Sequence, residues 1–369
     1  MKVPFVDLQG QYQGIKQEFR AAIDHVLETG DYISGPFVAS FEKNFAALHE
    51  AKYCVAVSSG TSALHIAMWA LGITTGDEVI VPTNTFIASA ASVNLAGATP
   101  IFVDCEDKYY NIDPDKVEEA ITKNTRAILA VHLYGQPAQL DKLKKIADKH
   151  QILLIEDCAQ AHLAHYKGKP IGTIGICGCF SFYPSKNLGA YGEGGAVLTN
   201  DESLHKKMLM LRDHGSNKKY YHSILGTNYR MHGMQGAILD VKLKYLKQWT
   251  DKRIKNAGLY NHHLKGLKQI VLPETMVEAK HVYHLFVIRT DSREALIEHL
   301  KKHEIAAGIH YPIACHQQEC YQGQSHKVNR SFPVSEKCAK QIISLPMYPE
   351  LTEDQISFTA SKVKEFFHA

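Results

Sequence analysis

The sequence predicts an α/β protein with a mostly parallel β-sheet that helices cover on both faces. Between residues 53 and 200, short apolar runs alternate with helical patterns, which is typical of βαβ units. The apolar runs are nearly continuous, as expected for strands buried on both faces. Polar motifs follow several of these runs, and ligands bind beyond the carboxyl ends of the strands in such sheets.

Seven short apolar runs are predicted to form the strands of this sheet. They are Tyr53–Val57, Glu78–Val81, Pro100–Val103, Ala127–Leu133, Ile152–Ile155, Cys179–Phe182 and Ala196–Leu198. Helical periodicity between the strands predicts helices at Thr61–Leu71, Phe86–Leu95, Asp115–Ile121 and Leu140–His150.

The rest of the chain predicts a second, smaller α+β domain. A long helical pattern from Met234 to Leu267 is expected to link the two domains, which we place at residues 1–245 and 246–369. Residues 1–30 are expected to pack with the small domain. The predicted elements of that domain are a strand at Val282–Arg289, a helix at Arg293–His303, a strand near Ile309, and helices at Glu336–Ile343 and Glu353–Phe367.

The composition argues against several classes of protein. The 369 residues are 45% hydrophobic and carry a formal net charge of only +3, so we expect no nucleic-acid or membrane-surface partner. No segment approaches the ~20 apolar residues of a membrane span, and the N-terminus lacks the apolar run of a signal peptide. The eight cysteines lack the spacing of a disulfide framework, so we expect reduced thiols and a cytoplasmic protein.

Histidine is frequent, with 21 residues, which invites a metal hypothesis. The nearest groupings are His162 with His165, Cys315 with His316, and the run His262–His263. None of them forms a convincing ligand set, so we expect no metal site.

A serine- and glycine-rich motif, Ser58–Leu64, directly follows the first predicted strand. It places backbone N–H groups and hydroxyls at the N-terminus of a helix, where unpaired donors and the helix dipole attract a phosphate. The alternative interpretation is a simple serine N-cap.

Asp157 ends the hydrophobic run that begins at Ile152. A buried carboxylate at the bottom of a cleft is costly unless it has a cationic or proton-donating partner. A protonated pyridine nitrogen is such a partner. Asp157 could alternatively cap the next turn.

Lys186 follows the strand Cys179–Phe182 and precedes the glycine-rich Gly192–Gly195. To form a Schiff base, its amine must be neutral part of the time, so its pKa must fall well below ~10.4. Burial and a nearby cation accomplish this, although a lysine after a strand is more often a solvated loop residue. Phe86, after another strand, could stack on a flat ring or be a core aromatic.

A phosphate cradle, an acid for a ring nitrogen and an amine for an aldehyde therefore occur on successive strand ends, and together they fit one ligand. In these motifs the sequence resembles the DegT/StrS family of sugar aminotransferases, a branch of the fold type I pyridoxal-phosphate enzymes. The resemblance extends from Val3–Leu8 to Ser344–Tyr348. The motifs that carry it are Ser59–Leu64, Glu156–His162, Phe180–Asn187, Gly192–Gly195, Asn228–Met231 and His310–Pro312.

The resemblance implies pyridoxal 5'-phosphate as the cofactor, with the following roles. Lys186 would bind the cofactor covalently and move protons, while Asp157 would keep the pyridine nitrogen protonated. Gln160 would contact the ring or its hydroxyl, and Phe86 would stack on the ring. The phosphate would be held by Gly60, Thr61 and Ser181, and by Asn228 of a neighbouring subunit. A homodimer with active sites shared across its interface is therefore expected.

The implied reaction transfers an amino group from L-glutamate to a nucleotide-linked keto sugar. Tyr183 ahead of the lysine resembles members that aminate C-3, so we favour a dTDP-linked 3-keto-6-deoxyhexose as substrate and a 3-amino-3,6-dideoxy sugar as product. Amination at another carbon, or of a UDP- or GDP-linked sugar, stays open. We expect Tyr183, Lys219, His310 and Tyr311 to bind the substrate. Alternatively, Lys219 lies in an exposed loop without ligand contact, and His310 and Tyr311 belong to a packed turn.

Three positions depart from the family pattern: Leu163 replaces a usual Gly, His232 stands in place of an acidic residue, and Cys315 lies where Pro or an aliphatic residue is commoner. The backbone after Gln160 is therefore expected to follow a different path. Two other hypotheses are considered. The protein could be a related dehydratase, which would have His in place of Lys186, or a non-catalytic binding or regulatory protein. Retention of Lys186 and Asp157 argues against both.

Overall fold

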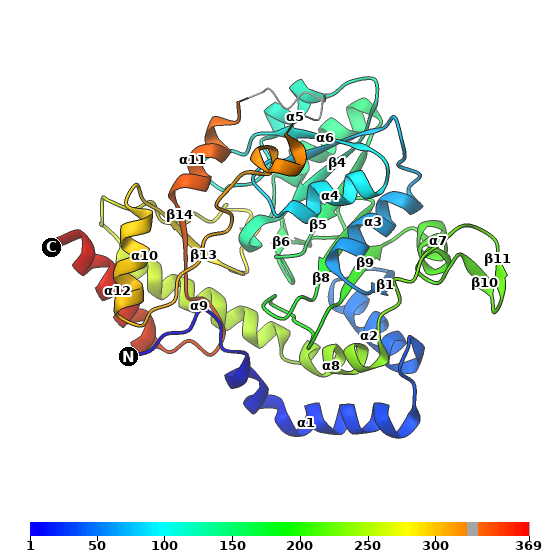
Figure 1. Cartoon of the computed structure of the whole chain (residues 1–369), viewed down its shortest axis with the longest axis horizontal. Coiled ribbons are helices and arrows are strands. Elements are labelled where there is room, and N and C mark those ends of the chain that lie inside the picture. The colour runs from blue at the N-terminus through cyan, green and yellow to red at the C-terminus, as the bar shows by residue number, and fades with distance from the viewer. Residues whose placement is uncertain (323–330, 369) are drawn as a thin grey trace.

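The computed structural model describes residues 1–322 and 331–368. A seven-stranded sheet forms its centre, with the strand order β1-β9-β8-β5-β4-β2-β3 (Figure 1). The strands are β1 (Tyr53–Val57), β2 (Glu78–Pro82), β3 (Thr99–Val103), β4 (Thr125–Val131), β5 (Leu153–Asp157), β8 (Cys177–Ser181) and β9 (Gly195–Thr199). Only β9 runs antiparallel to its neighbours β1 and β8. The predicted mostly parallel α/β sheet is therefore confirmed.

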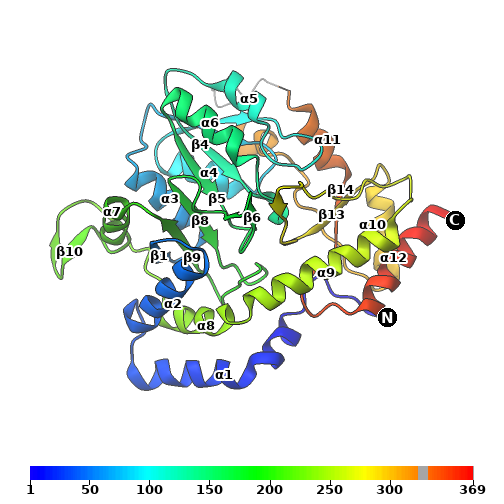
Figure 2. The same cartoon turned by 180° about the vertical axis from the view of Figure 1, so that it is seen from behind.

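Helices cover both faces of this sheet (Figures 1 and 2). One face packs under α3 (Gly60–Ala70), α4 (Ile87–Leu95) and α7 (Glu202–Arg212), and the other under α2 (Gly35–Leu48), α5 (Pro114–Ala120) and α6 (Leu140–His150). Neighbouring strand residues alternate between the two cores: Val79 and Val81 belong to the first, and Ile80 to the second. This alternation explains why the strands read as continuous apolar runs.

The C-terminal part of the chain builds a separate core. The antiparallel strands β13 (Phe286–Arg289) and β14 (Ile342–Leu345) pack with α9 (Leu246–Leu264), α10 (Arg293–Lys302) and α12 (Glu353–His368). Val3, near the N-terminus, is buried in this core and bridges to Ile305, whereas α1 (Leu8–Thr29) packs against α8 (Gly233–Leu243). Among the described residues, no helix combines the length and the apolarity that crossing a membrane requires.

The single helix predicted from Met234 to Leu267 is two helices, α8 and α9, which meet at Lys244 and Tyr245. Neither Pro nor Gly marks this junction. The break is decided by packing, because α8 lies against α1 and α2 while α9 lies against α12. The predicted domain boundary falls at this break, and the division into two domains stays a prediction.

Other predicted elements of the C-terminal part shift as well. The strand predicted from Val282 begins only at Phe286, and the residues directly before it, His284 and Leu285, line a cavity described below. The expected strand near Ile309 is a single bridge between Gly308 and Ser344. The helix predicted to Ile343 is α11 (Pro333–Gln341), and the following residues form β14. The sequence reading also missed α1, α2 and the exposed hairpin of β10 (Ser216–Lys218) and β11 (Tyr221–His222).

Leu163, which replaces a usual Gly, adopts the left-handed backbone conformation with φ of 62°. This conformation costs a residue with a Cβ about 1 kcal/mol. Its side chain is buried in the core beneath the sheet, which offsets that cost. The chain thus keeps at Leu163 a backbone conformation that glycine favours.

Candidate active site

A cavity of about 510 Å³ lies at the carboxyl ends of the parallel strands. One wall comes from the sheet and the N-termini of α3 and α4, and the other from residues 284–285, 310–311 and 347 of the C-terminal part. Phe5 and Val6 of the N-terminal segment also line it. The cavity brings together the predicted residues Gly60, Thr61, Phe86, Asp157, Gln160, Ser181, Tyr183, Lys186, His310 and Tyr311.

The N-terminus of α3, where a phosphate site is predicted, lines the cavity. Ser59 caps α3 by accepting a hydrogen bond from Ser62 N at 3.1 Å, which leaves the first amides of the helix facing the cavity. A Cβ on Gly60 would lie 2.6 Å from Cβ of Ser181. Only glycine therefore lets the start of α3 approach Ser181 this closely, and helix N-termini of this kind can bind an anion.

Asp157, the last residue of β5, is buried at the floor of the cavity. Its Oδ2 accepts from Ser89 Oγ at 2.8 Å, and its Oδ1 accepts from Ala159 N at 3.1 Å. Burial raises the pKa of this carboxyl group, and the hydrogen bonds from Ser89 and Ala159 and the charge of Lys186 oppose the rise. A protonated ring nitrogen here would give the carboxylate the cationic partner that its burial requires.

Lys186 lies in the turn after β8 and lines the same cavity. Burial lowers the pKa of its amine to about 8, while the Asp157 carboxylate opposes this shift. Near neutral pH an appreciable fraction of the amine is therefore unprotonated and nucleophilic. The low polarity of the cavity thus acts in opposite directions on the two groups: it raises the pKa of the acid and lowers that of the base.

Gln160 and Tyr311 form a hydrogen-bonded pair in the cavity wall. The side-chain oxygen of Gln160 accepts from the backbone N–H of Tyr134 at 2.6 Å, and its amide nitrogen donates to the Tyr311 hydroxyl at 3.2 Å. The Tyr311 ring lies 5.3 Å from that of Phe86, which is half exposed at the start of α4. Both rings are therefore available to a flat ligand.

His310 is held on the opposite wall. Its Nδ1 lies 2.9 Å from Ser344 Oγ, and its ring stacks on Phe5 at 5.5 Å. Burial, aided by the charge of Lys186, lowers the pKa of His310 to about 4, so the ring is neutral at physiological pH. A neutral imidazole can exchange hydrogen bonds with sugar hydroxyls without adding charge.

Asn228 and Lys219 do not line the cavity of their own chain. Lys219 lies at the exposed tip of the β10–β11 hairpin, which projects from the body of the protein (Figure 1). Asn228 is exposed and accepts a hydrogen bond from Arg230 Nε at 3.0 Å. Of the ionisable side chains in the described cavity wall, Asp157 and Glu193 are acidic, and Lys186 is the one lysine or arginine.

The turn that carries Lys186 is fastened from both sides by residues that the sequence reading missed. On one side, Asn187 donates to Val282 O at 3.1 Å and lies 3.3 Å from His284 Nδ1. On the other side, Gln235 of α8 forms two hydrogen bonds with the backbone of Tyr191, at 3.0 Å each. The amine is therefore positioned by the two parts of the fold that enclose the cavity.

Lys242 of α8 also holds the turn that carries Lys186. The side chain is fully buried, its ammonium donates to Gly189 O, and Nζ lies 4.8 Å from the centre of the Tyr191 ring. Burial lowers the pKa of Lys242 to about 7, and the charge of Glu350 opposes the shift. The one signal in the sequence was a lysine between the apolar residues Val241 and Leu243.

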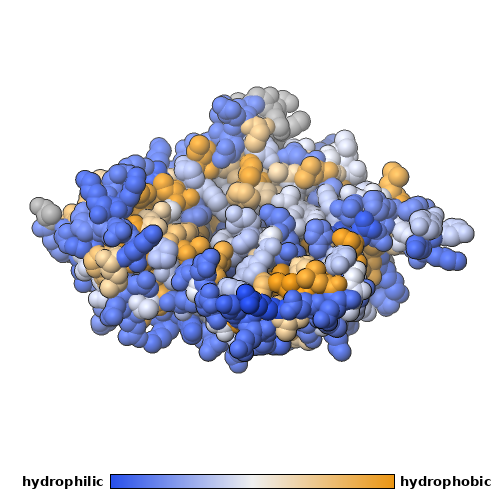
Figure 3. All heavy atoms as spheres, turned by 60° about the horizontal axis from the view of Figure 1, so that its bottom comes forward, coloured by the Kyte–Doolittle hydropathy of each residue, from blue (hydrophilic) through white to orange (hydrophobic). Residues whose placement is uncertain are grey.

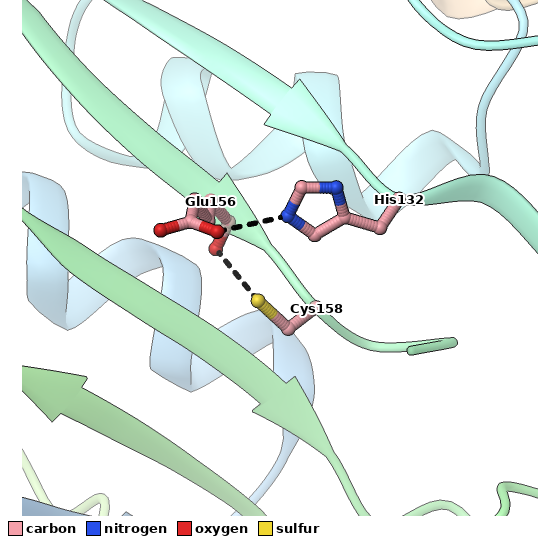
Figure 4. Close-up of side chains that lie close together, drawn as sticks. All are labelled: His132, Glu156 and Cys158. Carbon is pink, nitrogen blue, oxygen red and sulfur yellow. Dashed lines mark hydrogen bonds and ion pairs between the residues drawn. The ribbon is translucent and has the colours of Figure 1, made fainter. Parts of the chain in front are cut away.

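A buried group of His132, Glu156 and Cys158 has the side chains of a metal site, but the ligand atoms of His132 and Glu156 already form hydrogen bonds within the protein (Figure 4). The Glu156 carboxylate accepts three backbone N–H groups, from Gly172, Ile174 and Gly175, and lies 3.0 Å from His132 Nε2. The backbone N–H of Ala138 donates to His132 Nδ1, so the ring proton is on Nε2. This N–H donates a hydrogen bond to the Glu156 carboxylate. This network stabilises the loop after β5.

The chain belongs to the DegT/DnrJ/EryC1/StrS aminotransferase family, whose model matches residues 13–364. It is 44% identical over 365 residues to dTDP-3-amino-3,4,6-trideoxy-alpha-D-glucose transaminase of Streptomyces venezuelae, covering 99% of this chain and 96% of that protein. A Geobacillus stearothermophilus protein named pleiotropic regulatory protein is 42% identical over 369 residues, covering 100% and 99% of the two chains. A crystal structure of S. venezuelae DesV in complex with a ketimine intermediate matches with a TM-score of 0.97 and 43% identity, covering 100% and 99%.

The enzymes of this family depend on pyridoxal phosphate, and the cavity fits that cofactor. The N-terminus of α3 beside Ser181 suits the phosphate, the carboxylate of Asp157 lacks a cationic hydrogen-bond donor among the described residues, and Lys186 supplies the amine. The fold is that of the fold type I aminotransferases.

The buried Lys242 makes the stability of the protein depend on pH. Because its folded-state pKa of about 7 lies below the ordinary value of ~10.4, the unfolded chain binds a proton that the folded chain lacks between these pH values. The free energy of unfolding of the wild type, minus that of Lys242→Met, should therefore rise with pH above about 7, by roughly 1 kcal/mol per pH unit. Denaturant titrations at pH 7, 8 and 9 would measure this difference. Lys247→Met, at an exposed position of α9, is the control; an equal slope for both variants would contradict the assignment.

Proposed function

We propose that the protein transfers an amino group from L-glutamate, by way of pyridoxal phosphate, to a nucleotide-linked keto sugar. The observation that carries the proposal is that Lys186, Asp157 and the N-terminus of α3 line one cavity. Pyridoxal phosphate supplies an aldehyde that holds the amino group and a protonated ring that withdraws electrons. The residues of this chain bind that group, orient it and move protons.

Lys186 is proposed to bind the cofactor and then to act as the base that moves a proton at the substrate carbon. Its pKa of about 8 suits both tasks, because a base works best when its pKa is near the working pH. Asp157 is proposed to hold a proton on the ring nitrogen, and Gln160 to contact the ring edge. Gly60, Thr61 and Ser181 are proposed to hold the phosphate, with Phe86 against the ring.

The preferred substrate is a dTDP-linked 3-keto-6-deoxyhexose, which would give a 3-amino-3,6-dideoxy sugar. Tyr183 is half exposed at the cavity and follows Ser181 closely, so it is placed to contact a sugar that enters above the cofactor. His310 and Tyr311 offer a neutral imidazole and a hydroxyl on the opposite wall. The S. venezuelae relative is named for a dTDP-linked 3-amino sugar, which favours C-3.

A homodimer with shared active sites is proposed on electrostatic grounds. Glutamate brings two carboxylates and the sugar nucleotide brings a diphosphate, yet Lys186 is the one lysine or arginine in the described cavity wall. Further cations must therefore come from outside this wall. Lys219, on the projecting hairpin, is exposed and would supply such a cation to a second copy. Asn228, near the base of the hairpin, is also exposed, whereas Arg230 beside it is paired with Asp213.

The surface of one face also favours self-association. Apolar groups are exposed there between hydrophilic ones (Figure 3). Leu27, Tyr32 and Ile33, at the end of α1 and in the linker to α2, are each about half exposed. Neighbouring exposed apolar side chains are typical of protein interfaces.

A regulatory role is the second candidate, because the relative from G. stearothermophilus carries a regulatory name. A purely regulatory protein does not need a lysine of lowered pKa beside a buried carboxylate. Retention of Lys186 and Asp157 in one cavity therefore favours catalysis.

The catalytic proposal is tested by incubating the holoenzyme with glutamate and dTDP-, UDP- or GDP-linked keto sugars. Mass spectrometry should detect an aminated product, most rapidly with the dTDP-linked 3-keto-6-deoxyhexose, and loss of the visible cofactor band on adding glutamate should precede it. Lys186→Ala should remain folded and lose turnover by several orders of magnitude. Absence of any aminated sugar from an enzyme that binds the cofactor would reject the proposal, and turnover by Lys186→Ala would reject the assigned base.

Asp157→Asn should lower the turnover number by about 10²–10³-fold, because the ring nitrogen would lose the charge that keeps it protonated. Ser89→Ala is a matched control, since it removes one hydrogen bond to Asp157 and keeps the carboxylate. We expect a much smaller decrease for that variant. Near-normal steady-state kinetics for Asp157→Asn would overturn the proposed role.

Shared active sites predict complementation between two inactive variants. Co-expressed Lys186→Ala and Lys219→Ala/Asn228→Ala chains should form mixed dimers in which one of the two sites is intact. Random pairing should then restore about a quarter of the wild-type rate. If Lys219 and Asn228 served the site of their own chain, every site would carry a lesion and the mixture would stay inactive.

A further inference from the structure

A second group of metal-ligating side chains lies outside the cavity, between α10 and the C-terminal helix α12. His299 on α10, His303 at the end of that helix and Glu365 on α12 each offer one ligand atom, and the three atoms lie within 4.8 Å of one another. None of the three residues lines the candidate active site. We propose that they form a surface site for a divalent late transition-metal ion of the zinc class.

The hydrogen bond of His303 fixes which of its nitrogens faces Glu365. Its Nδ1 lies 2.9 Å from the backbone oxygen of His299, which can only accept, so Nδ1 carries the proton. Nε2 therefore is the nitrogen that faces Glu365 Oε1, at 3.6 Å. Either a proton on Nε2 or a metal ion between the two atoms would satisfy both of them.

A proton on His303 would join that ring to Glu365 and leave His299 unaffected. Nε2 of His299 is buried and has no hydrogen-bond partner among the described residues, although its ring lies 4.6 Å from that of His303. A metal ion, unlike a proton, can accept lone pairs from both rings and from the carboxylate. The arrangement of all three groups is therefore explained better by a metal than by an ion pair.

The dimensions and chemistry of the group suit zinc. Ligand atoms about 2.0–2.2 Å from a tetrahedral ion are separated by roughly 3.3–3.6 Å, close to the 3.6 Å between His303 Nε2 and Glu365 Oε1; the ligand atom of His299 lies within 4.8 Å of both. The second oxygen of Glu365 accepts from Lys362 at 2.6 Å, and the His303 Nδ1–H donates to backbone, so both ligands have outer partners that orient them. Two imidazoles and one carboxylate favour Zn²⁺, Ni²⁺ or Cu²⁺ over Mg²⁺, and leave a fourth position for water.

Occupation of this site would tie α12 to α10. Both helices bury apolar residues in the C-terminal core, which also contains Ile343 and Leu345 of β14. Ser344, between them, contacts His310 in the cavity wall. The proposed ion would therefore stabilise the part of the fold that forms the second wall, without contact with the reacting groups.

Calorimetric titration of the tag-free holoenzyme with zinc chloride at pH 7.5 tests the proposal. We expect one site per chain for zinc, no binding of magnesium, and a higher melting temperature with zinc. His303→Gln and, separately, Glu365→Gln should weaken zinc binding by more than tenfold. Both positions are partly exposed, so the variants should fold as the wild type does.

His262→Gln is the matched control, because His262 is an exposed histidine of α9 beside His263, outside the proposed site. It should bind zinc as the wild type does. At pH 5.5 zinc binding should be lost in the wild type, because the ligating nitrogens must be unprotonated. Absence of zinc binding, or equal affinity in the wild type and the His303→Gln and Glu365→Gln variants, would overturn the proposal.

Discussion

The electrostatic relation between Asp157 and Lys186 is the constraint on which the rest of the site depends. A carboxylate and an amine share one cavity of low polarity, where burial raises the pKa of the first and lowers that of the second. Each charge partly offsets the burial cost of the other. The arrangement leaves an acid that needs a cationic partner and an amine that can act as a nucleophile, which are the two requirements of a cofactor with an aldehyde and a basic ring nitrogen.

The backbone around these two groups holds each of them in place. Asp157 is fixed because it ends a buried parallel strand and accepts from Ser89 of α4. Lys186 lies in a turn that Asn187 fastens to the C-terminal wall and that Lys242 fastens to α8. The contacts that hold this turn include the buried amine of Lys242, and the burial of that amine lowers the stability of the fold.

Charge is also the basis of the proposal that two chains share their active sites. The described wall offers little positive charge for ligands that carry carboxylates and phosphates, while lysines lie on the exposed hairpin. The proposed dimer would bring these groups to the cavity of a second copy. The proposed zinc site, in contrast, belongs to a single chain and acts through the packing of α10 and α12.

The sequence by itself determined the parallel sheet, the strand ends and the motifs of the cofactor site, because each is a local pattern of apolar runs followed by polar residues. Gly60, Asp157 and Lys186 could be found in this way. Only the tertiary structure decided the break between α8 and α9, the start of β13 at Phe286 and the partners Ser89, Asn187 and Lys242. These features depend on packing between segments distant in the chain, which leaves no local pattern. The same holds for Leu163, where burial offsets a strained backbone, and for Asn228 and Lys219, whose distance from the cavity of their own chain follows from the fold.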